Sequence, residues 1–213
     1  NTLLSAPSGY FVLIDHIDSQ ISSLTPNFRL RSEKAGRPWV VVFTTDHGHL
    51  FGQHGLIAKG AFHYEDLLNI PFIVRYPDKV PADERCNSLQ SLVDLAPTFL
   101  SLCDIDIPGE MTGVDQSKVW LGKEDKARDY IICENRHEPD TVNLRTYVND
   151  RYKITVYYKR ECGELFDLKE DPDEVNNLWN NPEYQDLKKE LLLEFMWGEM
   201  GKEPLWMPRI ATA

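Results

Sequence analysis

Apolar residues near the N-terminus recur at steps of three and four, the spacing that places side chains on one face of a helix. They are Tyr10, Leu13, Ile14, Ile17, Ile21, Leu24 and Phe28. This pattern predicts an amphipathic helix over residues 10 to about 24. Proline lacks the backbone N–H that a helix interior uses, so we expect the helix to end near Pro26.

The next segments alternate between strand-like and helix-like patterns. Residues 39–44 (WVVVFT) are continuously apolar and rich in β-branched side chains, which is typical of a strand buried on both faces and favours a central parallel strand. A short helical segment at 64–68 precedes a second strand candidate at 72–76, and another helix is expected at 94–102. This order of helix, buried strand, helix and strand indicates an α/β fold.

The pattern changes near residue 130, where short strand-like runs follow one another. They occupy 130–133, 144–148 and 153–158 and are separated by polar turns, which is typical of a small antiparallel sheet. A final helix is expected from 182 to 195. We therefore divide the chain into an α/β part, residues 1–125, and a part with a small sheet and a terminal helix, residues 126–213.

Length and composition place the chain among globular proteins. It has 213 residues, 42% hydrophobic and 27% charged, which suits one hydrophobic core or slightly more. No apolar run approaches the roughly 20 residues of a membrane-spanning helix, so we expect no membrane span. The net charge of −11 argues against a nucleic-acid partner, because phosphate contacts need clustered Lys and Arg.

Two stretches carry candidate chemistry. Asp46-His47-Gly48 follows the buried strand, and open α/β sheets place ligand and metal groups beyond the carboxyl ends of their strands. A neighbouring carboxylate and imidazole can bind one divalent cation; alternatively, Asp46 caps a turn and His47 is an ordinary loop residue. Lys59 either extends along the surface or holds its charge toward an anion. The residues alone leave these alternatives open.

A set of short blocks is spread over almost the whole chain. In order, they are FTTDHG (43–48), GQHGL (52–56), KG (59–60), YE (64–65), IPFIV (70–74), VDLAPTFL (93–100), LRT (144–146), YK (152–153) and ELFDL (164–168). In this order and at this spacing, they resemble the second half of the sulfatase family within the alkaline-phosphatase-like superfamily. The resemblance implies part of an α/β/α sandwich followed by a small antiparallel sheet with a C-terminal helix.

The resemblance also implies a site. Asp46 and His47 correspond to two metal ligands, and Lys59 to the cation that contacts the sulfate oxygens. The implied metal is Ca²⁺, with Mn²⁺ or Zn²⁺ as alternatives because imidazole accepts softer ions. His63, His137 and Arg145 are candidates for contacting the rest of the substrate, a sulfated small molecule or glycan.

The chain departs from the family at the nucleophile. Sulfatases carry a C/S-x-P-x-R motif, whose Cys or Ser becomes formylglycine, and none of the four cysteines or the serines of this chain opens one. The chain also begins at Asn1 without Met or a basic leader, so we expect a cut N-terminus and a formylglycine in the missing half. The isolated chain is then expected to be inactive, and to associate with itself or with that half.

Three other functions are compatible with these residues. They are a phosphonate or phosphate-ester hydrolase of the same superfamily, a non-catalytic binding domain derived from it, and a complete small metalloenzyme built from the histidine cluster at 47–63. The last is disfavoured, because a catalytic metal usually has three protein ligands. The compartment is undetermined, although the family favours the periplasm or the outside of cells over the cytoplasm.

Overall fold

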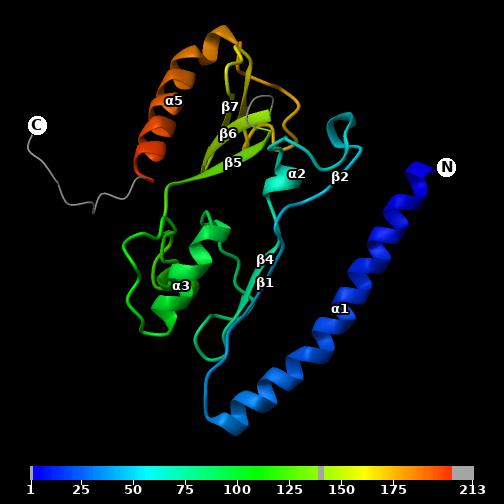
Figure 1. The fold of residues 1–213 in the computed structure, drawn as a ribbon, viewed down its shortest axis with the longest axis vertical. Coiled ribbons are helices and arrows are strands. Elements are labelled where there is room, and N and C mark those ends of the chain that lie inside the picture. The colour runs from blue at the N-terminus through cyan, green and yellow to red at the C-terminus, as the bar shows by residue number, and fades with distance from the viewer. Residues whose placement is uncertain (1, 139–141, 203–213) are drawn as a thin grey trace, which may run out of the picture.

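The computed structural model describes residues 2–138 and 142–202 (Figure 1). The elements of its first part are α1 (Thr2–Ala35), β1 (Val41–Thr44), β2 (Leu50–Phe51), η1 (Gln53–Gly55), β3 (Ile57–Ala58), α2 (Glu65–Leu68), β4 (Phe72–Arg75), η2 (Leu92–Asp94), α3 (Leu95–Leu102) and α4 (Ser117–Trp120). Those of its second part are β5 (Tyr130–Glu138), β6 (Val142–Asn149), β7 (Tyr152–Tyr157), β8 (Gly163–Asp167), η3 (Pro182–Tyr184) and α5 (Gln185–Met200). The expected order of elements is thus present, with α/β character throughout.

Helix α1 is longer than the sequence pattern predicts, and Pro26 lies inside it. Proline removes one donor from the helix, but neighbouring side chains donate to nearby carbonyls of the preceding turn. The Thr25 hydroxyl donates to the Ile21 carbonyl at 2.8 Å, and the Asn27 amide donates to the Ser23 carbonyl at 3.1 Å. The prediction that the helix ends near Pro26 was therefore wrong.

The pairing of β1 with β4 shows that the expected parallel direction of this strand was wrong. These strands pair antiparallel, with Val42 opposite Val74, and not parallel as the apolar run suggested. A continuous apolar run reports that both faces of a strand meet other groups; it carries no information about the direction of the neighbouring strand. In Figure 1 these two strands lie between α1 on one side and α3 on the other.

Strands β5, β6, β7 and β8 form the expected antiparallel sheet, in that spatial order. Helix α5 packs on one face of it, and side chains that alternate along the strands form the core with this helix. The buried members of this core are Tyr147, Ile154, Leu165, Leu178, Leu191 and Phe195. The predicted small sheet with a terminal helix is confirmed, and the division of the chain near residue 125 stays a prediction.

The opposite face of the sheet carries both apolar and polar buried side chains, and its polar members position the candidate site. Thr146, Lys153 and Thr155 lie on this face and are almost completely buried. They contact the segment around α2, whose residues come from the first part of the chain. Two distant regions of sequence therefore meet through polar contacts.

Among the described residues, no helix has both the length and the apolar character needed to cross a membrane.

Candidate functional site

Asp46 lies in the loop that follows β1, where its backbone and neighbours orient the carboxylate. Its Oδ1 accepts from the backbone N–H of His47 at 3.0 Å and from the Thr45 hydroxyl at 3.2 Å. The Thr45 hydrogen bond, followed by those of the backbone N–H groups, lowers the pKa of Asp46 below its ordinary value. The side chain is therefore an exposed carboxylate whose second oxygen, Oδ2, lies 3.4 Å from Nε2 of His47.

The ring of His47 has a defined tautomer in this arrangement. Its Nδ1 lies 2.8 Å from the carbonyl oxygen of Gly48, which can only accept, so Nδ1 carries the proton. Its Nε2 lies 3.1 Å from Nζ of Lys59, and the ammonium donates to it. A lone pair on Nε2 is what a metal ion binds in a histidine ligand.

Gly48 fixes this loop against α2. Its N–H donates to the carbonyl of Leu67 at 2.9 Å. A Cβ at position 48 would overlap the carbonyl oxygen of Asp66, so only glycine allows the backbones to approach this closely. The sequence after His47 is therefore held by the backbone of a helix 18 to 19 positions further along the chain.

Lys59 returns to the same place at the end of the hairpin β2–β3. Leu50 pairs with Ala58 in this hairpin, and Ala58 adopts a left-handed φ of 73°, which turns the chain immediately before Lys59. The side chain of Lys59 is exposed. Asp46, His47 and Lys59, which the sequence singled out, are thus brought together.

The donor set suits a divalent cation in part. A carboxylate oxygen and an imidazole nitrogen converge, and both types occur in Ca²⁺, Mn²⁺ or Zn²⁺ sites. Among residues 2–138 and 142–202, no group of three or more His, Cys, Asp or Glu side chains could hold a metal. Asp46 and His47 therefore fit as two ligands of a site that requires others.

His63 lies away from this cluster, in the interface with the small sheet. Its side chain is only 6% exposed, and Nδ1 lies 2.7 Å from the hydroxyl of Thr146. Burial, with a smaller contribution from the charge of Lys153, lowers the pKa of His63 to about 4. His63 is therefore a neutral side chain that joins the loop after Lys59 to the sheet.

The other two substrate-binding candidates lie in the small sheet. Arg145 is the neighbour of Thr146 in β6, so its side chain points to the opposite face, where it pairs with Glu134 at 3.5 Å and with Glu199 of α5. His137 lies in β5, and its side chain is outside what the structure describes. A role in substrate binding stays a prediction for both residues.

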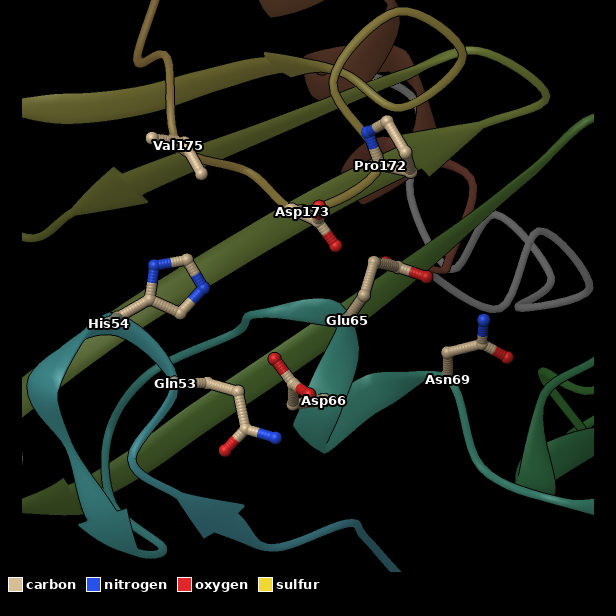
Figure 2. Close-up of a pocket in the computed structure, with 8 residues that line it drawn as sticks. All are labelled: Gln53, His54, Glu65, Asp66, Asn69, Pro172, Asp173 and Val175. Carbon is tan, nitrogen blue, oxygen red and sulfur yellow. The ribbon is translucent and has the colours of Figure 1, made fainter.

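A cavity of about 670 Å³ lies close to α2, between η1 and the turn at 172–175 (Figure 2). Its lining includes the carboxylates of Glu65, Asp66 and Asp173, together with the ring of His54. Glu65 is paired with Lys153, but the carboxylates of Asp66 and Asp173 repel an anion such as a sulfate ester. Electrostatics therefore favours the Asp46, His47 and Lys59 cluster over this cavity as the site for an anionic substrate.

Sequence reasoning missed an ion-pair cluster behind α2. Lys153, with no exposed side-chain surface, donates to Oε1 of Glu65 at 3.0 Å and pairs with Glu174. The signal in the sequence was a lysine within the apolar and β-branched run 153–156 (KITV), a position where a strand residue is commonly buried.

Comparison with known proteins identifies relatives of the chain. Residues 52–198 match the family model described as N-sulphoglucosamine sulphohydrolase, C-terminal. A Δ4,5-hexuronate-2-O-sulfatase of Bacteroides thetaiotaomicron is 31% identical over 190 residues, which cover 85% of this chain and 39% of that protein. The chain thus spans about two fifths of the length of this relative.

Solved structures support the fold. One similar structure, of a protein in complex with its substrate D-glucosamine-2-N,6-O-disulfate, has a TM-score of 0.69 and 26% identity, covering 78% of this chain and 35% of its own. A phosphonate monoester hydrolase from Silicibacter pomeroyi has a TM-score of 0.76 at 17% identity, covering 90% of this chain and 40% of its own. The latter likeness shows the fold alone. These neighbours confirm the expected α/β, alkaline-phosphatase-like fold class.

Proposed function

Because this chain belongs to the sulfatase family, we propose that it forms the C-terminal portion of a metal-dependent sulfatase that hydrolyses sulfate esters. One observation carries the proposal: Nε2 of His47 lies 3.4 Å from Oδ2 of Asp46 and 3.1 Å from Nζ of Lys59. Two potential metal ligands and one cation thus converge on one exposed point. Such a site can neutralise a tetrahedral anion.

The roles follow from the chemistry of each side chain. Asp46 and His47 would hold a divalent cation, which, when bound, stabilises negative charge on the nucleophile and on the sulfate oxygens. Lys59 binds the sulfate as a point charge. Its exposed ammonium can give up its hydrogen bond to Nε2 of His47 and donate to a sulfate oxygen instead. The hydrogen bond from Thr45, followed by those of the backbone N–H groups, favours the ionised form of Asp46 and lowers its pKa below the ordinary value.

We propose Ca²⁺ as the metal, with Mn²⁺ and Zn²⁺ as alternatives, because carboxylate oxygen is a hard ligand and imidazole also accepts softer ions. The remaining ligands and a formylglycine nucleophile come, in this proposal, from sequence outside these 213 residues. The isolated chain then lacks turnover. This part of the proposal is supported by the absence of a C/S-x-P-x-R motif from the sequence.

We propose a sulfated glycan or a smaller sulfate ester as the substrate. Support comes from the hexuronate-2-O-sulfatase relative and from the structural neighbour that binds a disulfated glucosamine. The intact cluster of Asp46, His47 and Lys59 argues against a domain that keeps only a binding role. The exposed position of the cluster leaves room for a substrate that extends beyond its sulfate group.

A titration with Mn²⁺ tests where the cation binds. Mn²⁺ broadens the NMR signals of nearby amides even when it binds weakly, so the 213-residue chain is suitable. We expect broadening to centre on Asp46, His47 and Lys59, and to disappear in the double variant Asp46→Asn, His47→Gln. Asp173→Asn serves as the control in the acidic cavity. Broadening centred on Glu65 and Asp173 instead would contradict the proposed ligands.

A further inference from the structure

Lys153 is a buried cation within a cluster of two carboxylates. It lies on β7, its side chain has no exposed surface, and its ammonium donates to Oε1 of Glu65 at 3.0 Å. It also pairs with Glu174, whose side chain is almost completely buried. Removing the cation from such a cluster would leave two carboxylates facing each other without compensation. The contacts of the three side chains are therefore mutually dependent.

Glu174 ties this cluster to the backbone of α2. Its Oε2 accepts from the N–H of Glu65, the first residue of α2, at 2.6 Å. Glu174 adopts a left-handed φ of 53°, which is unfavourable for a side chain of this kind. Asp171 stabilises the turn by accepting from the N–H groups of Val175 and Asn176. This strained turn directs Glu174 toward α2 and Lys153.

The backbone of α2 connects the cluster to the proposed metal ligands. Asp66 and Leu67 directly follow Glu65, and the carbonyl of Leu67 accepts from the N–H of Gly48 at 2.9 Å. The carbonyl oxygen of Gly48 in turn accepts a hydrogen bond from Nδ1 of His47. A movement of α2 would therefore move the group that sets the tautomer and orientation of His47.

His63 provides a second attachment to the same face of the sheet. Its Nδ1 lies 2.7 Å from the hydroxyl of Thr146, which lies 2.7 Å from that of Thr155, two residues after Lys153 on β7. His63 follows Lys59 by four positions. Polar side chains on this face of the small sheet thus support both sides of the proposed site.

We propose that Lys153, together with Glu65 and Glu174, is a positioning residue of the proposed site, since it locks α2 against the small sheet and thereby holds the Gly48 backbone and His47 in place. This inference rests on the proposed metal-binding role of Asp46 and His47. It assigns to the small sheet a role in positioning the loop that carries Asp46 and His47. Lys153 itself touches neither the proposed metal ligands nor Lys59 within the described contacts.

Amide hydrogen exchange in the 213-residue chain tests the proposal without any metal. In Lys153→Met, which keeps the apolar stem and removes the charge, we expect the amides of Gly48 and Leu67 to exchange at least about tenfold faster through local opening. The amides of β6 and of α5 should keep the protection of the unmodified chain. Glu65→Gln is the milder variant, because it keeps an acceptor for Lys153, and it should show a smaller effect in the same segment.

Arg151→Met is the matched control. Arg151 lies in the turn between β6 and β7 and makes a two-point ion pair with the buried Asp167, with distances of 2.7 and 3.1 Å. Among residues 2–138 and 142–202, the hydrogen bonds and ion pairs of its side chain do not reach α2. It should lower global stability without selective exposure of Gly48. If Arg151→Met opens residues 46–67 as strongly as Lys153→Met and Glu65→Gln do, or if neither of those two variants opens the segment, the positioning role is wrong.

Mn²⁺ binding then separates this inference from the proposed function. Loss of a group that orients metal ligands typically weakens metal affinity by about 10- to 100-fold, and we expect this range for Lys153→Met, measured by amide broadening. Unchanged Mn²⁺ affinity in this variant, with the broadening still centred on Asp46 and His47, would refute the inference and leave the proposed function intact. Failure of Mn²⁺ to bind at Asp46 and His47 in the unmodified chain would refute the proposed function instead, while the exchange data would still decide whether Lys153 orders the loop.

Discussion

The proton on Nδ1 of His47 determines what the neighbouring residues can bind. It is held by the Gly48 carbonyl at 2.8 Å, which leaves the lone pair of Nε2 facing Oδ2 of Asp46 and the ammonium of Lys59. In the structure, the ammonium of Lys59 donates a hydrogen bond to that lone pair. The same three side chains can therefore serve in two arrangements, and only the ammonium of Lys59 needs to move between them.

At this scale, Lys59→Ala is the most direct test of catalysis. In the complete sulfatase, loss of a preorganised charge against the sulfate oxygens should lower kcat by on the order of 100-fold or more. The melting temperature should change little, since Lys59 is exposed. Steady-state kinetics with an aryl sulfate and a thermal melt measure the two effects, and Lys79→Ala, another exposed lysine, is the control. A near-normal kcat and kcat/KM in Lys59→Ala would refute the catalytic role.

His63 makes a second prediction at the residue scale, concerning stability and pH. Its pKa is about 4 in the folded chain because of burial and Lys153, whereas an unfolded histidine titrates near 6.5. The unfolded chain therefore binds more protons between these values, so the free energy of unfolding falls as pH decreases from about 6.5 toward 4. For this residue alone, the loss should be on the order of 2 to 3 kcal/mol.

Urea unfolding of the 213-residue chain and of His63→Gln at several pH values measures this contribution. Glu174, also buried nearby, has a raised pKa that acts in the opposite direction, but it is present in both proteins. The difference between the two proteins should therefore shrink as pH falls. A difference that is independent of pH between 7 and 4.5 would show that His63 is not held neutral by the fold.

At the scale of elements, local pattern predicts what kind of element forms better than where it ends or what it pairs with. The three- and four-residue spacing of apolar side chains locates α1 because a helix repeats at that period. Its extension past Pro26 depends on side-chain donors at Thr25 and Asn27, which the apolar pattern does not include. The antiparallel pairing of β1 with β4 depends on which segments meet in space, and residues 39–44 carry no such information.

The candidate site shows the same division. Asp46, His47 and Lys59 lie within 14 positions and could be selected from the sequence, first by residue type and then by resemblance. Lys153 and Glu65 are 88 positions apart, and their pairing exists only because the face of the small sheet that carries Lys153 meets α2. Long-range ion pairs of this kind leave no periodic signal, and so the cluster behind α2 was missed.

At the scale of the whole molecule, α1 is the element that we expect to bind another protein surface. It stands apart from the small sheet and from α3 (Figure 1), and its contacts include those of Tyr10 with the rings of His49 and Phe51. Apolar side chains along it are exposed: Tyr10, Phe11, Val12, Leu13, Ile14, Ile17, Leu24, Phe28 and Leu30. Exposed apolar side chains gathered along a helix are commonly covered by another protein surface.

We therefore expect the purified 213-residue chain to self-associate, or to bind a complementary portion of a sulfatase when one is supplied. Burial of the exposed face of α1 drives the association, since apolar area removed from water is stabilising by about 25 cal/mol per Å². Light scattering after size-exclusion chromatography, together with binding of a hydrophobic dye, measures it. Leu13→Glu with Ile17→Glu should shift the chain toward the monomer, while Asp15→Lys with Asp18→Lys, on the polar positions of the same helix, should not. A monomer with low dye binding before any substitution would show that α1 packs onto the rest of the chain and needs no partner.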